Sequence, residues 1–163
     1  MNRLSRREWI LGAGGFALLP LGACNSADAA KRSFRFQLSD ADWRKRLQPA
    51  AYQTLRRRAT ETPYSSQLNK QNGHGHFICA GCDQPLFMSI TKFESGTGWP
   101  SFWKPLTGAV GTTTDYVIGY ARTEVHCSRC GGHLGHVFDD GPKPTGKRYC
   151  INGVALKFDP EAR

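Results

Sequence analysis

The chain has 163 residues and a formal net charge of +9, with 22 lysines and arginines against 13 acidic residues. That length fits one domain with some additional chain. Because 39% of the residues are hydrophobic, the sequence can form a core, which excludes a fully disordered protein. No apolar run reaches the roughly 18 residues that a membrane-spanning helix needs. The six cysteines suggest a disulfide framework. The basic charge suggests an acidic partner such as nucleic acid.

The first 29 residues have the layout of an export signal. A basic segment containing Arg6 and Arg7 precedes an apolar stretch, and small residues follow. The segment SRREWIL resembles a twin-arginine leader, an address that a receptor reads for export. A buried amphipathic helix is the alternative, but the glycines and the proline of this stretch weaken it. We therefore predict a leader at 1–29, a linker at 30–38 and one folded domain at 39–159.

Two processing sites are compatible with this leader. Residues 21–24, LGAC, resemble a lipobox, in which Cys24 becomes the lipidated first residue. Residues 27–29, ADA, resemble the site of ordinary signal peptidase. Both remain open, so we expect a periplasmic protein that is either soluble or membrane-anchored as a lipoprotein. Either cut removes three arginines and at most two acidic residues, so the mature chain stays basic.

Two short helices are expected at the start of the domain. Ser39 begins a capping box of the form S-x-x-D, and acidic residues followed by basic ones favour a helix over 40–47. Pro49 suits the first turn of a second helix, whose apolar residues recur at three- and four-residue spacing. This spacing turns the three arginines at 56–58 mostly outward, and we interpret them as a solvated face.

From residue 75 onward the sequence indicates an antiparallel β domain. Short runs rich in Val, Ile, Phe, Tyr and Thr occur at 76–78, 111–120, 135–138 and 148–158, separated by Gly, Pro and Asp-Gly. Strands do not alternate with helices as they do in proteins with a parallel sheet. The predicted fold class is therefore mainly β, with short N-terminal helices.

Four cysteines form two C-x-x-C knuckles, Cys79 with Cys82 and Cys127 with Cys130. Each knuckle turns the backbone so that two thiolates reach one ion, and two knuckles complete a tetrahedron. In an exported protein two disulfides are the alternative, but the glycines beside each knuckle suit metal turns. We predict a structural zinc ion, because four sulfur ligands leave no open position for catalysis.

Cys150 is the candidate nucleophile. It lies in the segment KRYCIN, whose alternation predicts a strand with Arg148, Cys150 and Asn152 on one face. A fixed cation beside a thiol lowers the pKa of that thiol, and the thiolate is the reactive form. A buried, unreactive cysteine is the alternative reading of this position.

Two histidines and a tryptophan lie in neighbouring motifs. In the segment HLGH, His133 and His136 would point to opposite faces of a regular strand. Both can serve one site only if Gly135 hosts a bulge or a turn. Trp99 lies on a loop rich in glycine and proline, where it is either part of the core or a wall that receives an apolar methyl group.

Three segments resemble the B-type methionine sulfoxide reductases: KFESGTGWPSF, RTEVHCSRCGGHLGHVFDDGP and TGKRYCIN, in this order and with the two knuckles. The resemblance covers residues 39–159. It implies two antiparallel sheets, a structural zinc ion and thiol-dependent reduction of methionine R-sulfoxide, free or in oxidised proteins. It makes Cys150 the nucleophile and Trp99 the wall for the methyl group. The residues that it implies around the sulfoxide oxygen are His133, His136 and Asn152, with Asp140 and Arg148 in support.

Many members of that family have a resolving cysteine where this sequence has Thr97. The four knuckle cysteines are assigned to zinc, so we expect an external thioredoxin-like thiol to reduce the sulfenic acid left on Cys150. Cys24 could replace that thiol only if it escapes lipidation and reaches the site. We expect a monomer without a nucleic-acid partner, because the export leader argues against one. The alternative function is a zinc-stapled extracellular interaction module without catalysis.

Overall fold

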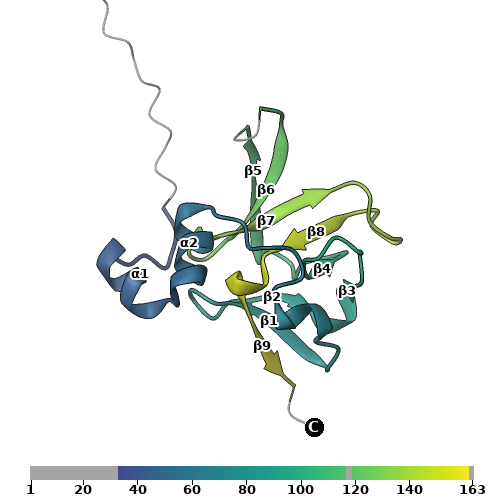
Figure 1. Cartoon of the computed structure of the whole chain (residues 1–163), viewed down its shortest axis with the longest axis horizontal. Coiled ribbons are helices and arrows are strands. Elements are labelled where there is room, and N and C mark those ends of the chain that lie inside the picture. Colours follow the sequence, from purple (N-terminus) through teal and green to yellow (C-terminus); the bar gives the residue numbers. More distant parts are fainter. Residues whose placement is uncertain (1–32, 117–118, 162–163) are drawn as a thin grey trace, which may run out of the picture. The chain divides into compact units, whose positions relative to one another are not determined.

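The computed structural model describes residues 33–116 and 119–161 (Figure 1). The predicted leader, with Cys24 and both processing sites, lies outside these described residues. Within them, no helix has the length and apolar character needed to cross a membrane. The predicted linker is described only from residue 33, and it already packs there: the Phe36 N–H donates to the Arg129 carbonyl at 3.0 Å.

Two short helices precede the sheets, as the sequence predicts. Helix α1 (Asp40–Arg46) begins after Ser39, whose Oγ accepts a hydrogen bond from the backbone N–H of Asp42. Helix α2 (Pro49–Arg57) has its proline in the first turn and ends at Arg58, which adopts a left-handed φ of 61°. The buried residues of α2 are Ala51, Tyr52, Thr54 and Leu55.

The strands form two antiparallel sheets, which confirms the predicted fold class. The smaller sheet has the order β2-β1-β9 and the larger sheet the order β3-β4-β8-β7-β6-β5. The strands are β1 (Gly75–Cys79), β2 (Pro85–Met88), β3 (Lys92–Phe93), β4 (Ser101–Phe102), β5 (Val110–Asp115), β6 (Arg122–Cys127), β7 (His133–Phe138), β8 (Arg148–Ile151) and β9 (Leu156–Pro160). Short 3-10 helices lie at η1 (Gln67–Lys70), η2 (Ser89–Thr91) and η3 (Gly153–Ala155).

Two expected runs differ from the strands that form. The run at 148–158 is two strands in different sheets, because β8 ends at Ile151 and the chain passes through η3 into β9. The run at 111–120 stops as a strand at Asp115. Strand β6 was not predicted, because charged residues at its start break the apolar pattern.

The apolar core lies between the two sheets. Phe77 of β1, Phe87 of β2 and Phe102 of β4 are fully buried, and the rings of Phe87 and Phe102 stack with centroids 4.3 Å apart. Burying a side chain of this size contributes about 1.5–3 kcal/mol. Because side chains alternate along a strand, Ser101 lies on the opposite face of the larger sheet from its neighbour Phe102.

A row of paired residues crosses the larger sheet on that opposite face. Residues directly opposite each other on antiparallel strands place their side chains on the same face. Ser101 pairs with Cys150, Cys150 pairs with His136, and His136 pairs with Glu124. Strand pairing therefore aligns the predicted nucleophile, one predicted histidine and a carboxylate across β8, β7 and β6.

Candidate active site

A cavity of about 130 Å³ opens on this face of the larger sheet beside Cys150. Four of the predicted site residues line it: Cys150, Trp99, His136 and Asn152. The other lining residues are Thr60, Arg122, Gly135 and Phe138. The remaining predicted residues, His133, Arg148 and Asp140, are not part of the lining.

Cys150 is half-buried, and its Sγ lies 3.9 Å from the hydroxyl of Thr97. Burial raises the pKa of the Cys150 thiol, and this effect outweighs Thr97 and Arg148, which lower the pKa. The sequence argument from the neighbouring cation is therefore corrected: the cation is in place, but burial is the larger effect. In this structure the resting thiol is mainly protonated at neutral pH.

Arg148 is fixed by Asp140 and by an aromatic ring. Its Nε and Nη2 donate to the two carboxylate oxygens of Asp140, each at 2.8 Å. The guanidinium lies over the Phe138 ring, 4.5 Å from the ring centroid. The hydrogen bond from Arg148 also lowers the pKa of Asp140. Asp140 and Phe138 therefore hold the positively charged guanidinium of Arg148 next to Cys150.

Trp99 is held by the loop around it. Its indole Nε1 donates to the Glu61 carbonyl at 3.2 Å. The preceding residue, Gly98, has a φ of +93°, and a Cβ there would lie 2.8 Å from the Pro63 side chain. The Tyr64 N–H donates to the Gly98 carbonyl at 2.7 Å. The indole is thus fixed as one wall of the cavity.

Asn152 is buried and joins two backbone segments. Its Nδ2 donates to the Leu134 carbonyl at 2.9 Å, and its Oδ1 accepts from the Glu61 N–H at 2.9 Å. A primary amide carries two hydrogens on nitrogen. Asn152 therefore has one N–H left for the cavity that it lines.

Strand β7 contains a bulge, but the extra residue is Leu134, whereas the predicted position, Gly135, is paired with both neighbouring strands. Val125 of β6 pairs with Gly135, whereas the next residue, His126, pairs with His133, so β7 has one extra residue between them. This bulge brings the rings of His133 and His136 to a centroid distance of 5.4 Å. The two histidine rings therefore lie next to each other on the same side of the sheet.

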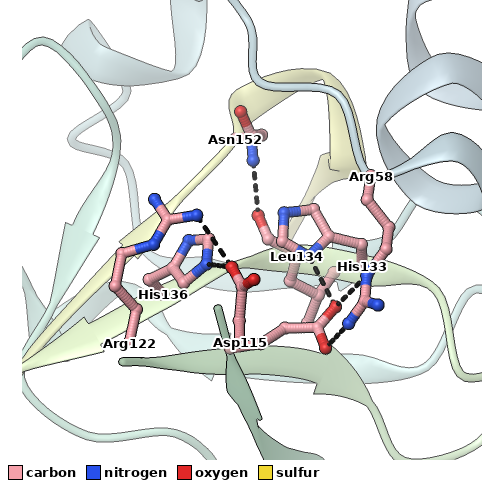
Figure 2. Close-up of polar contacts among 8 residues, drawn as sticks. Arg58, Asp115, Arg122, His133, Leu134, His136 and Asn152 are labelled. Carbon is pink, nitrogen blue, oxygen red and sulfur yellow. Dashed lines mark hydrogen bonds and ion pairs between the residues drawn. The ribbon is translucent and has the colours of Figure 1, made fainter. Parts of the chain in front are cut away.

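Each histidine is held by a carboxylate that the sequence analysis did not single out. Nδ1 of His133 lies 2.8 Å from Oε1 of Glu124 on β6. Nε2 of His136 lies 2.7 Å from Oδ2 of Asp115 on β5 (Figure 2). The charged residues at the start of β6 were the only sequence feature that could have indicated these contacts. They do not show which histidine a carboxylate would contact.

Each carboxylate also binds an arginine (Figure 2). Arg122 donates from Nη2 to Oδ2 of Asp115 at 2.7 Å. Arg58 donates from Nε to Oε1 of Glu124 at 3.0 Å and from Nη2 to Oε2. Arg58 is exposed, as the sequence predicts for the arginines at 56–58, but its side chain also reaches the buried carboxylate of Glu124.

These contacts determine the charges around the histidines. Burial raises the pKa of Glu124, but the bonds from His133 and Arg58 outweigh burial, and the net pKa is lowered. For His136, burial lowers the pKa, Asp115 raises it and Arg122 lowers it again, with a net decrease. The Glu124 carboxylate is therefore ionised, and His136 is mainly neutral at pH 7.

The four knuckle cysteines meet at a second site. Their Sγ atoms all lie within 4.8 Å of one another, and all four residues are buried. Cys79 and Cys130 have their sulfurs 3.8 Å apart, and Cys82 and Cys127 have theirs 3.6 Å apart. Zinc with four Zn–S bonds of about 2.3 Å places its sulfurs about 3.8 Å apart. The donor set therefore fits a structural zinc ion, and none of these cysteines forms a disulfide.

Comparison with known proteins identifies the family. A family model described as the SelR domain matches residues 47–160, a range that contains the cavity lining and both knuckles. The chain belongs to the SelR family. Its SelR relatives include the "Peptide methionine sulfoxide reductase MsrB" of Leptospira interrogans, 50% identical over 130 residues, 79% of this chain and 99% of that protein.

Two further relatives extend the SelR match. The protein of the same name from Agrobacterium fabrum is 52% identical over 123 residues, 75% of this chain and 91% of that protein. The "Peptide methionine sulfoxide reductase B1, chloroplastic" of Arabidopsis thaliana is 47% identical over 136 residues, 83% of this chain and 67% of that protein. By name, these SelR relatives are oxidoreductases.

Proposed function

We propose that this chain reduces methionine R-sulfoxide to methionine, in oxidised proteins or as the free amino acid. The relatives are named for the reduction of methionine sulfoxide. The observation that carries the proposal is the half-buried thiol of Cys150 in a small cavity lined by Trp99 and His136. At about 130 Å³ the cavity is far smaller than the roughly 300–1,000 Å³ of drug-sized ligand sites. That size suits a methyl sulfoxide group.

The chemistry needs a nucleophile at sulfur and an acid at oxygen. The Cys150 thiolate attacks the sulfoxide sulfur while a protonated histidine, His136 or His133, donates to the oxygen. The proton that the thiol loses can charge that histidine. The S–O bond of the substrate breaks, the oxygen ends as the hydroxyl of a sulfenic acid on Cys150, and methionine leaves. One thiol and one sulfoxide become one sulfenic acid and one thioether, so atoms and electrons balance.

Regeneration then requires two external thiol groups. The first thiol attacks the sulfenic acid, which releases water and leaves a mixed disulfide on Cys150. The second thiol displaces Cys150 by disulfide exchange. We propose a thioredoxin-like protein as this reductant, since Thr97 is the residue beside the nucleophile and the four knuckle cysteines suit a metal.

The replacement Cys150→Ser tests the mechanism. We expect it to abolish turnover of a dabsylated methionine R-sulfoxide peptide with dithiothreitol as reductant, followed by chromatography. The matched control, Cys24→Ser, removes the cysteine outside the folded domain and should retain normal turnover. Near-normal activity in the Cys150→Ser protein would falsify the mechanism.

The same substrate separates catalysis from a binding-only module. One equivalent of R-sulfoxide without reductant should return methionine and add one oxygen to Cys150, read by mass spectrometry of the intact protein. An interaction module would leave both the peptide and the cysteine unchanged.

For the cellular location we propose export by the twin-arginine route to the periplasm. The support is the sequence of residues 1–29, which carries a basic pair, an apolar stretch and two cleavage signals. Mass spectrometry of the mature N-terminus distinguishes a lipidated Cys24 from a soluble form that begins near Ala30. An intact Met1 in exported fractions would contradict both forms.

A further inference from the structure

The two histidines of the site are held through different ring nitrogens. Glu124 contacts Nδ1 of His133, whereas Asp115 contacts Nε2 of His136. An ionised carboxylate only accepts hydrogen bonds, so the ring nitrogen that it contacts carries the hydrogen. In a neutral imidazole the other nitrogen is then an acceptor. The two rings therefore present different nitrogens to the rest of the site.

We propose that Glu124 and Asp115 are positioning residues that impose opposite tautomers, Nδ1–H on His133 and Nε2–H on His136. They thereby fix which nitrogen of each ring is left as an acceptor, Nε2 in His133 and Nδ1 in His136, and His136 is the one that lines the cavity. This inference rests on the proposed function for its catalytic consequence, but the tautomers themselves follow from the contacts.

The arginines keep both carboxylates as acceptors. Arginine stays protonated in proteins, and a buried carboxylate remains ionised only when it is paired and hydrogen-bonded. The side chains of Glu124 and Asp115 are 6% and 8% exposed, and each receives an arginine N–H from Arg58 or Arg122. Both carboxylates therefore stay ionised. An ionised carboxylate has no proton, so neither of them can donate one to a histidine.

The two nitrogens that do not face a carboxylate lie in different surroundings. Nε2 of His133 is buried and has no hydrogen-bond partner among the described residues. Leaving such an atom unsatisfied costs about 1–3 kcal/mol. His136 lines the cavity, and its Nε2 is occupied by Asp115, which leaves Nδ1 for a ligand. Figure 2 shows the His136 ring at the carboxylate of Asp115.

A fixed tautomer matters because proton transfer depends on which nitrogen faces the substrate. In serine proteases a buried aspartate behind the catalytic histidine holds the ring in one tautomer. Replacing that aspartate with the uncharged asparagine lowers kcat by about 10⁴-fold. The present site has two such carboxylates, one on β6 and one on β5, each behind its own histidine.

Nitrogen NMR of the full-length protein labelled with ¹⁵N-histidine tests the tautomers directly. At a pH where the spectra show both rings to be neutral, we expect hydrogen on Nδ1 of His133 and on Nε2 of His136. Asp115→Leu should convert His136 to a tautomer mixture and leave His133 unchanged, and Glu124→Met should do the reverse. The matched control is Asp83→Asn, an exposed carboxylate bound to Arg46 and Lys157 away from the histidines. Hydrogen on the opposite nitrogens, or variants that do not change their own histidine, overturns the inference.

Kinetics separate positioning from support of the fold. A positioned acid contributes about 10²–10⁴-fold to a rate, so we expect Asp115→Leu and Glu124→Met to lower kcat about 10- to 100-fold with little change in KM. Glu124→Gln should recover most of kcat, because its amide oxygen can still accept from Nδ1 of His133. Equal losses in the Gln and Met variants would mean a structural role. If the unaltered protein reduces no sulfoxide, the proposed function fails, while the spectra still decide the tautomers.

Discussion

At the scale of single residues, Cys150 experiences two opposing effects. Burial raises the pKa of its thiol, whereas Thr97 and Arg148 lower the pKa, and burial is the larger effect. A thiol with a raised pKa loses its proton only as the pH rises past the ordinary value of about 8.5. The free protein therefore keeps Cys150 mainly as the thiol, and in the proposed mechanism the thiolate forms in the complex with substrate.

Alkylation by iodoacetamide checks this direction. We expect the rate of modification of Cys150, counted by peptide mass spectrometry, to keep rising as the pH passes 8.5. Arg148→Met should move the curve to higher pH, because the thiolate loses its nearby cation. An inflection well below pH 8.5, or a shift to lower pH in the variant, would contradict the assignment.

Thr97 also lowers the pKa of the Cys150 thiol, by a smaller effect than burial. Its hydroxyl is 3.9 Å from the Cys150 sulfur and also contacts the Ser95 hydroxyl at 2.8 Å. We expect Thr97→Ala to change kcat by less than about twofold, since a neutral hydrogen bond is worth only about 0.5–1.5 kcal/mol even at good geometry. Steady-state assays with dithiothreitol measure the change, and a loss comparable to that of Cys150→Ser would assign Thr97 a chemical role.

At the scale of elements, β7 and β8 approach closely at Gly135. A Cβ at this position would lie 2.0 Å from the Cys150 carbonyl oxygen and 3.0 Å from Cα of Ile151. These are backbone atoms of the paired strand, so only a shift of β7 away from β8 could relieve the clash. Such a shift would also move His136 from its partner Cys150.

We expect Gly135→Ala to destabilise the fold by about 1–3 kcal/mol and to remove most of the turnover. Urea denaturation and kcat measure the two effects. The control is Gly108→Ala, where φ is 70° and no atom lies within 4 Å of the added Cβ, so only the left-handed backbone cost of about 1–2 kcal/mol applies. Full activity in Gly135→Ala would show that the strands tolerate separation.

Local patterns predicted the elements that depend on local chemistry. The capping serine at Ser39 and the proline at Pro49 were enough for both helices, and two-residue alternation placed Arg148 and Cys150 on one face of β8. Asn152, predicted on the same strand, instead follows the end of β8 at Ile151 and precedes η3. The long apolar run that follows was read as one strand, because periodicity does not show that a 3-10 turn redirects the chain into another sheet.

The carboxylates of the site were beyond this kind of prediction. Asp115 and His136 are 21 positions apart in the chain, and Glu124 and His133 are nine apart. These pairs meet only through the register of β5, β6 and β7, together with one bulge. Sequence motifs mark the histidines themselves, whereas the groups behind them follow from strand pairing.

At the scale of the whole molecule, the four-cysteine cluster connects the two sheets. Cys79 ends β1 in the smaller sheet, and Cys127 ends β6 in the larger sheet. Their partners Cys82 and Cys130 lie in the turns that follow. A metal ion held here is a cross-link between layers that otherwise contact through their apolar side chains.

Removal of this metal should therefore weaken the whole fold. We expect one zinc ion per chain, and a chelator or Cys82→Ser should lower Tm substantially, because structural zinc supplies folding free energy directly. Acid should release the ion, since protons compete for the thiolates. Metal analysis and calorimetry provide the measurements. Two disulfides in the intact protein, or an unchanged Tm after metal removal, would contradict this role.

The order of strands has a consequence for how activity is lost. Cys150 lies on β8 in the interior of the larger sheet, but Asp115, which contacts His136, lies on β5, an edge strand. Edge strands have only one neighbour and open at lower free-energy cost than central strands. Fraying of β5 would release His136 while the core between the sheets stays closed. Heating should accordingly inactivate the protein reversibly at temperatures where it is still folded.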